Sequence, residues 1–269
     1  MKMGTEQIQK YLKRINYTEP ILNNGETLEK LQYAHLKNIP YENLDILNHI
    51  PLSLELPNLF NKIIERNRGG YCFELNSVYC WLLESIGFKV ESLLGRFIIG
   101  ETDIQMRCHR ILKVEATDGI YLCDVGVRSE SPRVALKLIQ NEIQSDGFSE
   151  YKFIKEKFWG LVLWQKEEGK NWVRMYAFTE EPQLDIDYHM PSFYCEQHPD
   201  SDFNKYMKLS IFTESGRVSL VGSTLKIYSG IDNVRRITLE GKEEIEIEIK
   251  KYFGIGKNHF EKNHLGGPE

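Results

Sequence analysis

The hydrophobic pattern of the chain changes at about Phe88, and this change restricts the folds that the chain can adopt. Before it, apolar residues recur at helical spacing, and Ile8, Tyr11, Leu12 and Ile15 share one helix face. After it, glycines separate short segments rich in β-branched and aromatic residues, at 89–94, 110–115, 121–125, 159–164 and 171–178. The pattern predicts an α+β fold, in which helices precede antiparallel strands of a small barrel or sandwich.

Two more helices are predicted before Phe88. The helical spacing resumes after Asn23-Asn24-Gly25 with Leu28, Leu31 and His35. A longer apolar stripe follows the Gly69-Gly70 pair, and it consists of Leu75, Val78, Tyr79, Leu82 and Ile86. Gly87 stands where a helix C-terminal cap belongs.

The last third of the chain mixes strand and helix signals. Residues 191–202 have the irregular composition of a linker. Strand-like segments follow at 209–213, 218–221 and 224–228. In residues 239–253, Ile245, Ile247 and Ile249 alternate as in a strand, but the glutamate and lysine content favours a helix. We predict a helix there.

Composition and charge narrow the functional classes. The 269 residues allow one large domain or two to three small ones. A net charge of −5 without a basic stripe argues against a nucleic-acid partner, and no apolar run reaches the roughly 20 residues of a membrane-spanning helix. Residues 1–17 contain no apolar signal core. Together with an odd count of five cysteines, these features predict reduced thiols and a cytoplasmic protein.

Cys72 is the first candidate for chemistry. It lies in the segment Arg-Gly-Gly-Tyr-Cys-Phe-Glu-Leu-Asn, residues 68–76, where a glycine pair ends a loop and a helical pattern begins. Backbone N–H groups and the dipole of a helix N-terminus are expected to lower the pKa of such a thiol and to hold a developing oxyanion. Cys72 is therefore a candidate nucleophile, although a cysteine at a helix start more often only fills space.

His109 and Asp124 supply a candidate base and the acid that orients it. His109 begins one strand-like segment and Asp124 ends the next, with the hairpin-turn signal Asp118-Gly119 between them. Adjacent antiparallel strands would bring the two side chains together. The order Cys, His, acid is that of papain-like folds, with the cysteine on a helix and the other two on a sheet. Spacing alone leaves a purely structural role open for each residue.

These residues carry a family resemblance. Residues 68–76 resemble the signature of the arylamine N-acetyltransferases, Arg-Gly-Gly-x-Cys-Phe-Glu-Leu-Asn. Four other segments resemble elements of that family in the same order: Pro-Tyr-Glu-Asn-Leu at 40–44, the histidine strand at 109, Asp-Val-Gly at 124–126, and His-Pro-Asp-Ser-Asp-Phe at 198–203. The resemblance covers nearly the whole chain. It implies a helical domain at 1–87, a β-barrel domain at 88–195 and an α/β lid at 196–269.

The resemblance also implies an activity, which is the acetyl-CoA-dependent N-acetylation of arylamines, arylhydrazines or N-hydroxyarylamines in xenobiotic metabolism. Cys72 would carry an acetyl-cysteine in a ping-pong cycle, His109 would act as the base, and Asp124 would hold the imidazole. Acetyl-CoA is the implied donor and no metal is implied; the sequence contains no Cys-x-x-Cys or His-x-His cluster. A homo-oligomer is left open.

The resemblance further implies ligand contacts, for CoA by Gly126, Arg128 and Ser129, and for the acceptor by Tyr41, Val127 and Phe203. The chain departs from the family pattern at Val127-Arg128, where the family usually has Phe-Gly. Val127 would enlarge or reshape the acceptor pocket. Arg128 would either pair with a CoA phosphate or obstruct the backbone approach that glycine allows.

Other interpretations stay open at this stage. The chain could be another Cys-His-Asp enzyme, such as a transglutaminase-like enzyme or a cysteine peptidase, although the residues around Cys72 fit those families less well. It could also be a catalytically weak relative that binds CoA or a partner. The other four cysteines are predicted to be packing residues. Glu42 and Arg68 form either a buried ion pair behind the cysteine loop or a surface pair.

Overall fold

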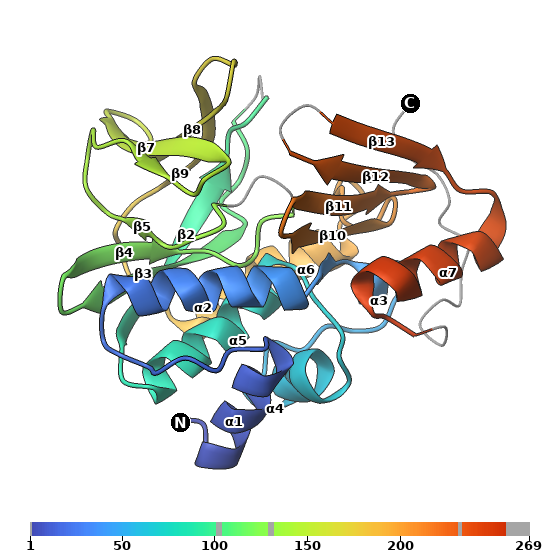
Figure 1. The fold of residues 1–269 in the computed structure, drawn as a ribbon, viewed down its shortest axis with the longest axis horizontal. Coiled ribbons are helices and arrows are strands. Elements are labelled where there is room, and N and C mark those ends of the chain that lie inside the picture. The colour runs from blue at the N-terminus through green and yellow to red at the C-terminus, as the bar shows by residue number, and fades with distance from the viewer. Residues whose placement is uncertain (1, 101–103, 129–131, 231–232, 257–269) are drawn as a thin grey trace.

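A computed structural model describes residues 2–100, 104–128, 132–230 and 233–256, and its helical N-terminal part is followed by two sheets (Figure 1). The first part contains α1 (Thr5–Arg14), α2 (Gly25–Asn38), α3 (Leu44–Leu47), α4 (Leu56–Phe60), the π-helix η1 (Asn61–Glu65) and α5 (Cys72–Ser85). Asn24 caps α2, because its side chain accepts a hydrogen bond from the Thr27 backbone N–H. The predicted α+β class and its helical beginning are confirmed.

Helix α5 lies at the centre of the molecule. Its side chains are buried from Cys72 to Leu83, because α1 and α4 pack on it from one side and β2 and β3 of the first sheet from another. The predicted apolar stripe is therefore only part of its buried surface. The helix ends as predicted before Gly87, whose φ of 107° suits glycine.

The first sheet has the strand order β5-β4-β3-β2-β9-β8-β7-β6. Its strands are β2 (Lys89–Phe97), β3 (His109–Ala116), β4 (Gly119–Cys123), β5 (Leu136–Lys137), β6 (Gln144–Ser145), β7 (Ser149–Glu156), β8 (Gly160–Glu167) and β9 (Val173–Phe178). The Gln144 side chain donates to the Lys137 carbonyl and accepts from the Lys137 N–H, so it joins the two end strands. The sheet is thus nearly closed into a barrel.

The second sheet has the order β1-β10-β11-β12-β13. Its strands are β1 (Tyr41–Glu42), β10 (Lys208–Thr213), β11 (Gly216–Val221), β12 (Thr224–Ser229) and β13 (Asn233–Thr238), and α7 (Gly241–Phe253) packs against β10. The predicted C-terminal helix is confirmed, because Ile245, Ile249 and Phe253 are its buried face and Gly254 ends it with a φ of 69°. β1 comes from the helical part of the chain, so this part also contributes to the last sheet.

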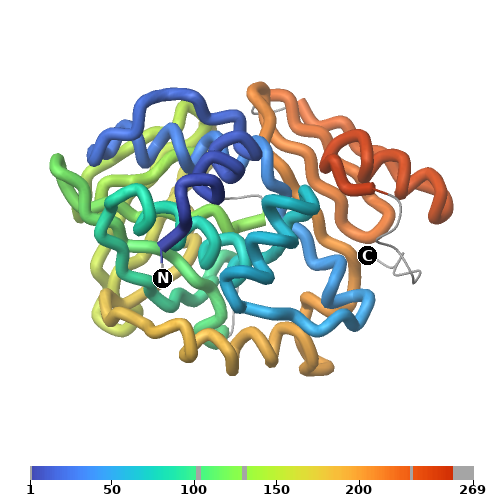
Figure 2. Tube along the Cα trace, turned by 90° about the horizontal axis from the view of Figure 1, so that it is seen from below, coloured from blue at the N-terminus to red at the C-terminus, as the bar shows by residue number. Residues whose placement is uncertain are grey.

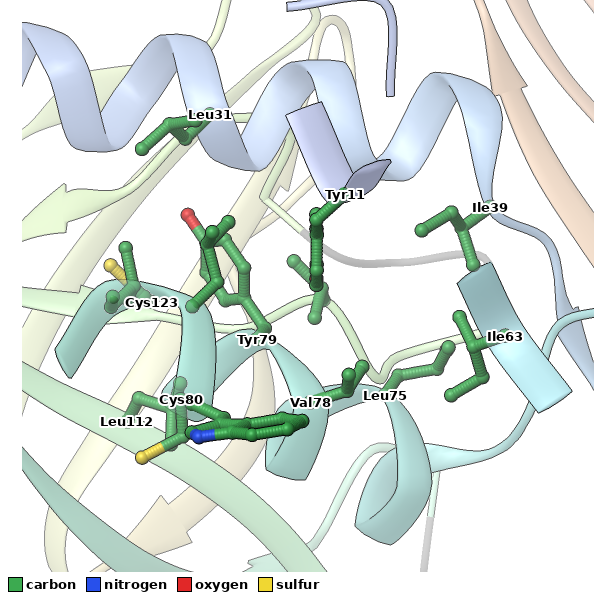
Figure 3. Close-up of a cluster of buried hydrophobic side chains, with 14 of the residues drawn as sticks. Tyr11, Leu31, Ile39, Ile63, Leu75, Val78, Tyr79, Cys80, Leu112 and Cys123 are labelled. Carbon is green, nitrogen blue, oxygen red and sulfur yellow. The ribbon is translucent and has the colours of Figure 1, made fainter. Parts of the chain in front are cut away.

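The main hydrophobic core joins the helices to the barrel. Figure 3 shows Tyr11, Leu31, Leu75, Tyr79 and Leu112 of this core, which come from α1, α2, α5 and β3. Each of these side chains is fully buried. Because α5 is packed from several sides, the position of its first residue is fixed relative to β3.

The predicted linker at 191–202 is wrong for most of its length. Residues His189–Gln197 form helix α6, preceded by a 3-10 turn, η2 (Asp185–Tyr188). Figure 2 shows this segment crossing the outside of the molecule from the barrel to the second sheet. Pro191 is compatible with this helix because it lies in the first turn, where a backbone N–H has no partner in the helix.

Several strands were not predicted. β7 has the alternating burial of a half-buried strand, with Tyr151 and Phe153 inside. The matching alternation of polar and apolar residues was present in the sequence. The two-residue strands β5 and β6 are too short to give a pattern. β13 is mostly exposed, so it has no apolar periodicity. The residue boundaries of the three domains stay a prediction. No helix in the described residues is long and apolar enough to cross a membrane.

Candidate active site

The glycine pair before Cys72 allows a close packing of backbone. A Cβ atom on Gly69 would lie 1.9 Å from the Pro40 carbonyl oxygen, and one on Gly70 would lie 2.8 Å from Oε2 of Glu74. The same Glu74 oxygen accepts a hydrogen bond of 3.2 Å from the Tyr71 N–H, just before α5 begins. Only glycine fits at both positions, and the loop therefore delivers Cys72 to the first position of α5.

The thiol of Cys72 contacts the strand that carries His109. Its Sγ lies 3.6 Å from the Cys108 carbonyl oxygen, and the backbone N–H of Arg110 is near enough to lower the pKa of the thiol. Cys108 and Arg110 are the two chain neighbours of His109. The fold therefore places the sulfur beside His109, although 37 positions separate the two residues in the sequence (109 − 72).

The electrostatics of Cys72 differ from the sequence prediction. Burial raises the pKa of this thiol well above its usual value, and the nearby Cys108 adds to the effect. The N–H groups of Arg110 and Phe73 lower the pKa but do not outweigh burial. A helix N-terminus is therefore not sufficient to ionise Cys72.

His109 and Asp124 meet as the predicted hairpin requires. β3 and β4 pair in antiparallel register with Leu112 opposite Cys123, which brings the side chains at the open end of the hairpin together. Nε2 of His109 lies 2.7 Å from Oδ2 of Asp124, and both side chains are almost completely buried. The rings of Phe97 and Tyr176 flank the imidazole at centroid distances of 4.6 and 5.3 Å.

The second imidazole nitrogen of His109 is left for another partner. Nδ1 is buried and has no hydrogen-bond partner among the described residues. With Nε2–H donating to Asp124, Nδ1 carries the lone pair of a neutral imidazole. The Cys72 thiol contacts the carbonyl of Cys108, the residue just before His109.

Asn76 and Gln32 hold the acid in place. Asn76 donates to Oδ1 of Asp124 at 2.9 Å and accepts from the Val125 N–H at 3.0 Å. Gln32 accepts from the Asp124 N–H at 2.9 Å, and the Gly126 N–H donates to Oδ1. Sequence reasoning assigned no role to either amide. The sequence did point to Asn76, because this residue lies one helical turn after Cys72 and is the last residue of the motif at 68–76.

The residues predicted to contact CoA have three different outcomes. Gly126 lies against Cys72, since a Cβ there would come within 2.6 Å of Cys72 Cα. Arg128 is half-buried and close enough to Tyr41 to affect its pKa. Ser129 lies outside the described residues. Contact of any of them with CoA stays a prediction.

Two of the predicted acceptor-contacting residues lie near Cys72. Tyr41 is buried on β1, and burial, followed by the charge of Cys72, raises the pKa of its hydroxyl. Phe203 contacts the Tyr71 ring, at a centroid distance of 5.7 Å. Val127 instead packs into the core of the barrel. Acceptor binding by all three stays a prediction.

Lys208 was not predicted. It begins β10, and its ammonium lies 5.4 Å from the centroid of the Phe203 ring and 4.7 Å from that of Tyr206. Burial, followed by repulsion from Arg128, lowers the pKa of Lys208 to about 8. Nothing in the sequence indicates this, because Arg128 lies in the loop after β4 and Lys208 begins β10, and only the fold brings them together.

Behind the cysteine loop lies an ion-pair cluster made of Glu42, Asp45, Lys62, Arg68 and Glu74. All five side chains are buried. Arg68 pairs with Glu42 at 2.7 Å and with Asp45 at 2.8 Å, and Lys62 pairs with Asp45 and Glu74 at 2.7 Å each. The buried alternative for Glu42 and Arg68 is thus confirmed, within a larger network than the sequence predicted.

The remaining cysteines are free thiols. Cys80 and Cys123 are buried in the main core, as predicted for packing residues. Cys195 is also buried there, whereas Cys108 is only partly buried against it. Among the residues that the structure describes, no group of three or more His, Cys, Asp or Glu side chains could hold a metal ion.

Comparison with known proteins decides the family. A family model described as N-acetyltransferase matches residues 25–260. The arylamine N-acetyltransferase of Escherichia coli is 30% identical over 94% of this chain and 90% of its own length. The chain belongs to the arylamine N-acetyltransferase family. It is an acyltransferase, and the transglutaminase and peptidase alternatives are excluded.

Other members of the arylamine N-acetyltransferase family agree in sequence and fold. The enzyme of Mycolicibacterium smegmatis is 32% identical over 91% of this chain and 90% of its own length. The structure of the Salmonella typhimurium enzyme superposes with a TM-score of 0.90 at 28% identity, covering 95% of this chain and 93% of that one. The Mycobacterium marinum enzyme in complex with CoA gives 0.86 at 28% identity, with 92% of each chain covered.

Proposed function

We propose that the protein N-acetylates arylamines, arylhydrazines or N-hydroxyarylamines with acetyl-CoA, in a ping-pong cycle through an acetyl group on Cys72. One observation carries this proposal. The His109 imidazole is fixed through Nε2 to Asp124, its buried Nδ1 lacks a partner among the described residues, and the Cys72 sulfur contacts the backbone beside it. This arrangement supports a nucleophile, a base and an orienting acid.

The first half-reaction loads Cys72. Nδ1 of His109 accepts the thiol proton, and Asp124 stabilises the resulting imidazolium through Nε2. The sulfur attacks the acetyl carbonyl carbon, the bond from that carbon to the CoA sulfur breaks, and the CoA thiolate takes the proton from His109. Because a thioester is exchanged for a thioester, this step is nearly balanced in free energy.

The second half-reaction unloads Cys72. An amine nitrogen of the acceptor attacks the acetyl carbonyl carbon and the bond from that carbon to Cys72 breaks. His109 accepts the proton that the amine loses, and returns it to the Cys72 sulfur. Asp124 keeps its contact with Nε2 in both half-reactions, so one acid–base pair serves both.

The charges near Cys72 support binding of a phosphorylated donor. Arg128 and Lys208 interact electrostatically, and a CoA phosphate between them would relieve their repulsion. A cytoplasmic location is supported by the five free thiols, which persist in reducing compartments. Tyr41 and Phe203 supply aromatic surface for the acceptor.

The test is acetyl loading in the absence of acceptor. The wild-type protein is incubated with acetyl-CoA at neutral pH with reductant, and its intact mass is measured. We expect the mass of one acetyl group, mapped to Cys72 by peptide analysis. Cys72→Ser should show none of it under these conditions, while the matched control Cys80→Ser, on the same helix, should load normally.

Absence of loading on the folded wild-type protein would contradict the proposed activity and leave the catalytically weak relative as the interpretation. Loaded protein is then offered a panel of arylamines and hydrazides. Release of the acetyl group by at least one of them, with formation of the acetylated amine, is expected.

A further inference from the structure

A cavity that the proposed reaction does not use lies between the barrel and the second sheet. Its volume is about 260 Å³, slightly below the range of drug-sized ligand sites. The barrel part of the chain lines it with Arg133, Phe148 and Tyr151, and the second sheet with Phe212, Arg217 and Tyr228. The cavity lies near Thr213 at the end of β10, five residues from Lys208 (213 − 208), which is roughly 16 Å along a strand. It is therefore separate from the candidate active site.

Arg133 connects the two sides of this cavity. Its Nη1 donates to the Thr213 carbonyl at 2.9 Å and its Nη2 to the Gly216 carbonyl at 2.7 Å, on either side of the β10–β11 turn. The same guanidinium lies 3.5 Å from the centroid of the Phe148 ring, which belongs to the barrel part. No carboxylate among the described residues forms an ion pair with Arg133, so carbonyl oxygens and a ring surround its charge.

Arg217 has an unsatisfied donor in the wall of the cavity. Its Nε is buried and has no hydrogen-bond partner among the described residues. Its guanidinium lies over the Tyr228 ring, 4.0 Å from the centroid. Because a guanidinium is planar and its N–H groups lie in that plane, contact of one face with a ring leaves the edge free to donate. A buried N–H without a partner is costly, and a bound acceptor would remove that cost.

The charged side chains that line the cavity leave one positive charge uncompensated. Three of them are basic and two are acidic (3 − 2). Lys170 pairs with Glu167, and the Asp146 carboxylate already accepts four hydrogen bonds from donors of the barrel part. Burial lowers the pKa of Arg133, Asp146 opposes this effect, and repulsion from Arg217 adds to it. A single negative charge in the cavity would balance its lining.

We propose that this cavity binds a small anion with a carboxylate or phosphate group, held by Arg133 and Arg217 between the barrel and the second sheet. Arg217 supplies the N–H donors, whereas Arg133 supplies mainly charge because both of its Nη atoms already bind carbonyls. The volume admits the anionic group together with a small organic body. The inference is independent of the acetyl-transfer proposal, because neither arginine has a part in that reaction.

The experiment follows backbone hydrogen exchange in the full chain, in a buffer free of phosphate and carboxylates. Inorganic phosphate, phenyl phosphate and benzoate are added separately at about 10 mM, tenfold above a Kd of about 1 mM. We expect at least one of them to slow exchange in residues 146–149 and 212–217, which border the cavity. An effect of inorganic phosphate alone identifies a free ion as the occupant, and an effect of phenyl phosphate or benzoate identifies an organic anion. Benzamide, the neutral analogue of benzoate, should leave these segments unchanged.

Variants assign the binding to the cavity. Arg217→Gln should weaken anion binding, measured by calorimetry, by about tenfold or more, because a charge-assisted hydrogen bond is lost. Arg235→Gln removes an exposed arginine from β13 of the same sheet and should bind like the wild type.

Three outcomes would overturn the proposal. One is that none of the three anions slows exchange in these segments of the wild-type protein, a result that stands even if a variant fails to fold. Another is equal binding by folded Arg217→Gln. The third is protection confined to the segments around Cys72, which would assign the anions to the candidate active site.

Discussion

Two buried polar clusters involve residues at the start of α5, and they are built differently. The triad cluster of Cys72, His109 and Asp124 keeps one buried nitrogen, Nδ1 of His109, without a partner among the described residues. In the ion-pair cluster behind the loop, every one of the five charged side chains has an opposite charge within 2.8 Å. Proton transfer requires an acceptor atom that no other group already occupies, whereas a cluster that only stabilises the fold does not require one.

The charges of the ion-pair cluster show how strongly its members are coupled. Burial alone would raise the pKa of Asp45, but Lys62 and then Arg68 lower it to about 2. Burial raises the pKa of Glu74 even though Lys62 opposes it. Three carboxylates share two cations, so removal of either cation leaves buried negative charge uncompensated. This cluster should therefore govern stability, and the triad cluster should govern chemistry.

The largest effect is expected from Asp124→Asn, which acts on the triad cluster. The substitution removes the anion that orients His109 and stabilises its charged form, so acetyl transfer should fall by about 10³- to 10⁴-fold. Single-turnover loading of Cys72 measures the rate, and circular dichroism checks the fold. An unchanged rate would show that another acid fills this role.

Next in size is Lys62→Met, which acts on the ion-pair cluster. It leaves Asp45 and Glu74 without their shared cation, and breaking a buried pair in this way costs about 3–5 kcal/mol. Urea unfolding should show that loss in the free energy of unfolding. Lys10→Met, which removes an exposed pair, serves as control and should leave stability unchanged. If Lys62→Met instead slows loading of the folded protein as much as Asp124→Asn, the division between the two clusters is wrong.

A smaller effect is expected from Asn76→Ala, which removes a support of the triad cluster. The substitution takes the Asn76 partner away from the Val125 N–H and the Arg110 carbonyl and removes one of the hydrogen bonds to the Asp124 carboxylate, at a cost of about 1–3 kcal/mol. If that cost falls on the orientation of Asp124, loading slows by about 10- to 100-fold. Rescue of the rate by Asn76→Gln is not expected, because the longer side chain displaces these hydrogen bonds.

The smallest effect concerns pH and Lys208. Because its pKa is lowered to about 8, Lys208 is charged at pH 7 and mostly neutral at pH 9. CoA binding, measured by calorimetry, should weaken by up to about fivefold between these values, as expected for one partly exposed charge pair. Lys208→Arg keeps its charge and should remove that pH dependence. The same pH dependence in Lys208→Arg would assign it to another group.

Much of the candidate site could be predicted from local sequence. The glycine pair and the helical spacing after it located Cys72 at a helix start, and the Asp118-Gly119 turn brought His109 and Asp124 together. The unpredicted partners are those that the chain reaches over long separations. Gln32 contacts Asp124 from α2, and Lys208 on β10 approaches Arg128 in the loop after β4. No local pattern encodes such contacts.

The pKa of Cys72 shows the same limit. A helix start by itself lowers the pKa of a thiol, and the sequence supports no other prediction. Whether that thiol is also buried depends on how α1, α4 and the barrel pack around α5. Burial changes the net shift of the thiol pKa from a decrease to an increase.

The sequence by itself indicated the helices on either side of the Cys72 loop, most of the longer strands and the three residues of the candidate site, because periodicity, turns and caps are local properties of the backbone. The tertiary structure alone decided the closed ion-pair cluster, the burial of Cys72 and the contact of Gln32 with Asp124. Those features depend on desolvation and on distances between segments far apart in the chain, and both exist only after the elements have packed.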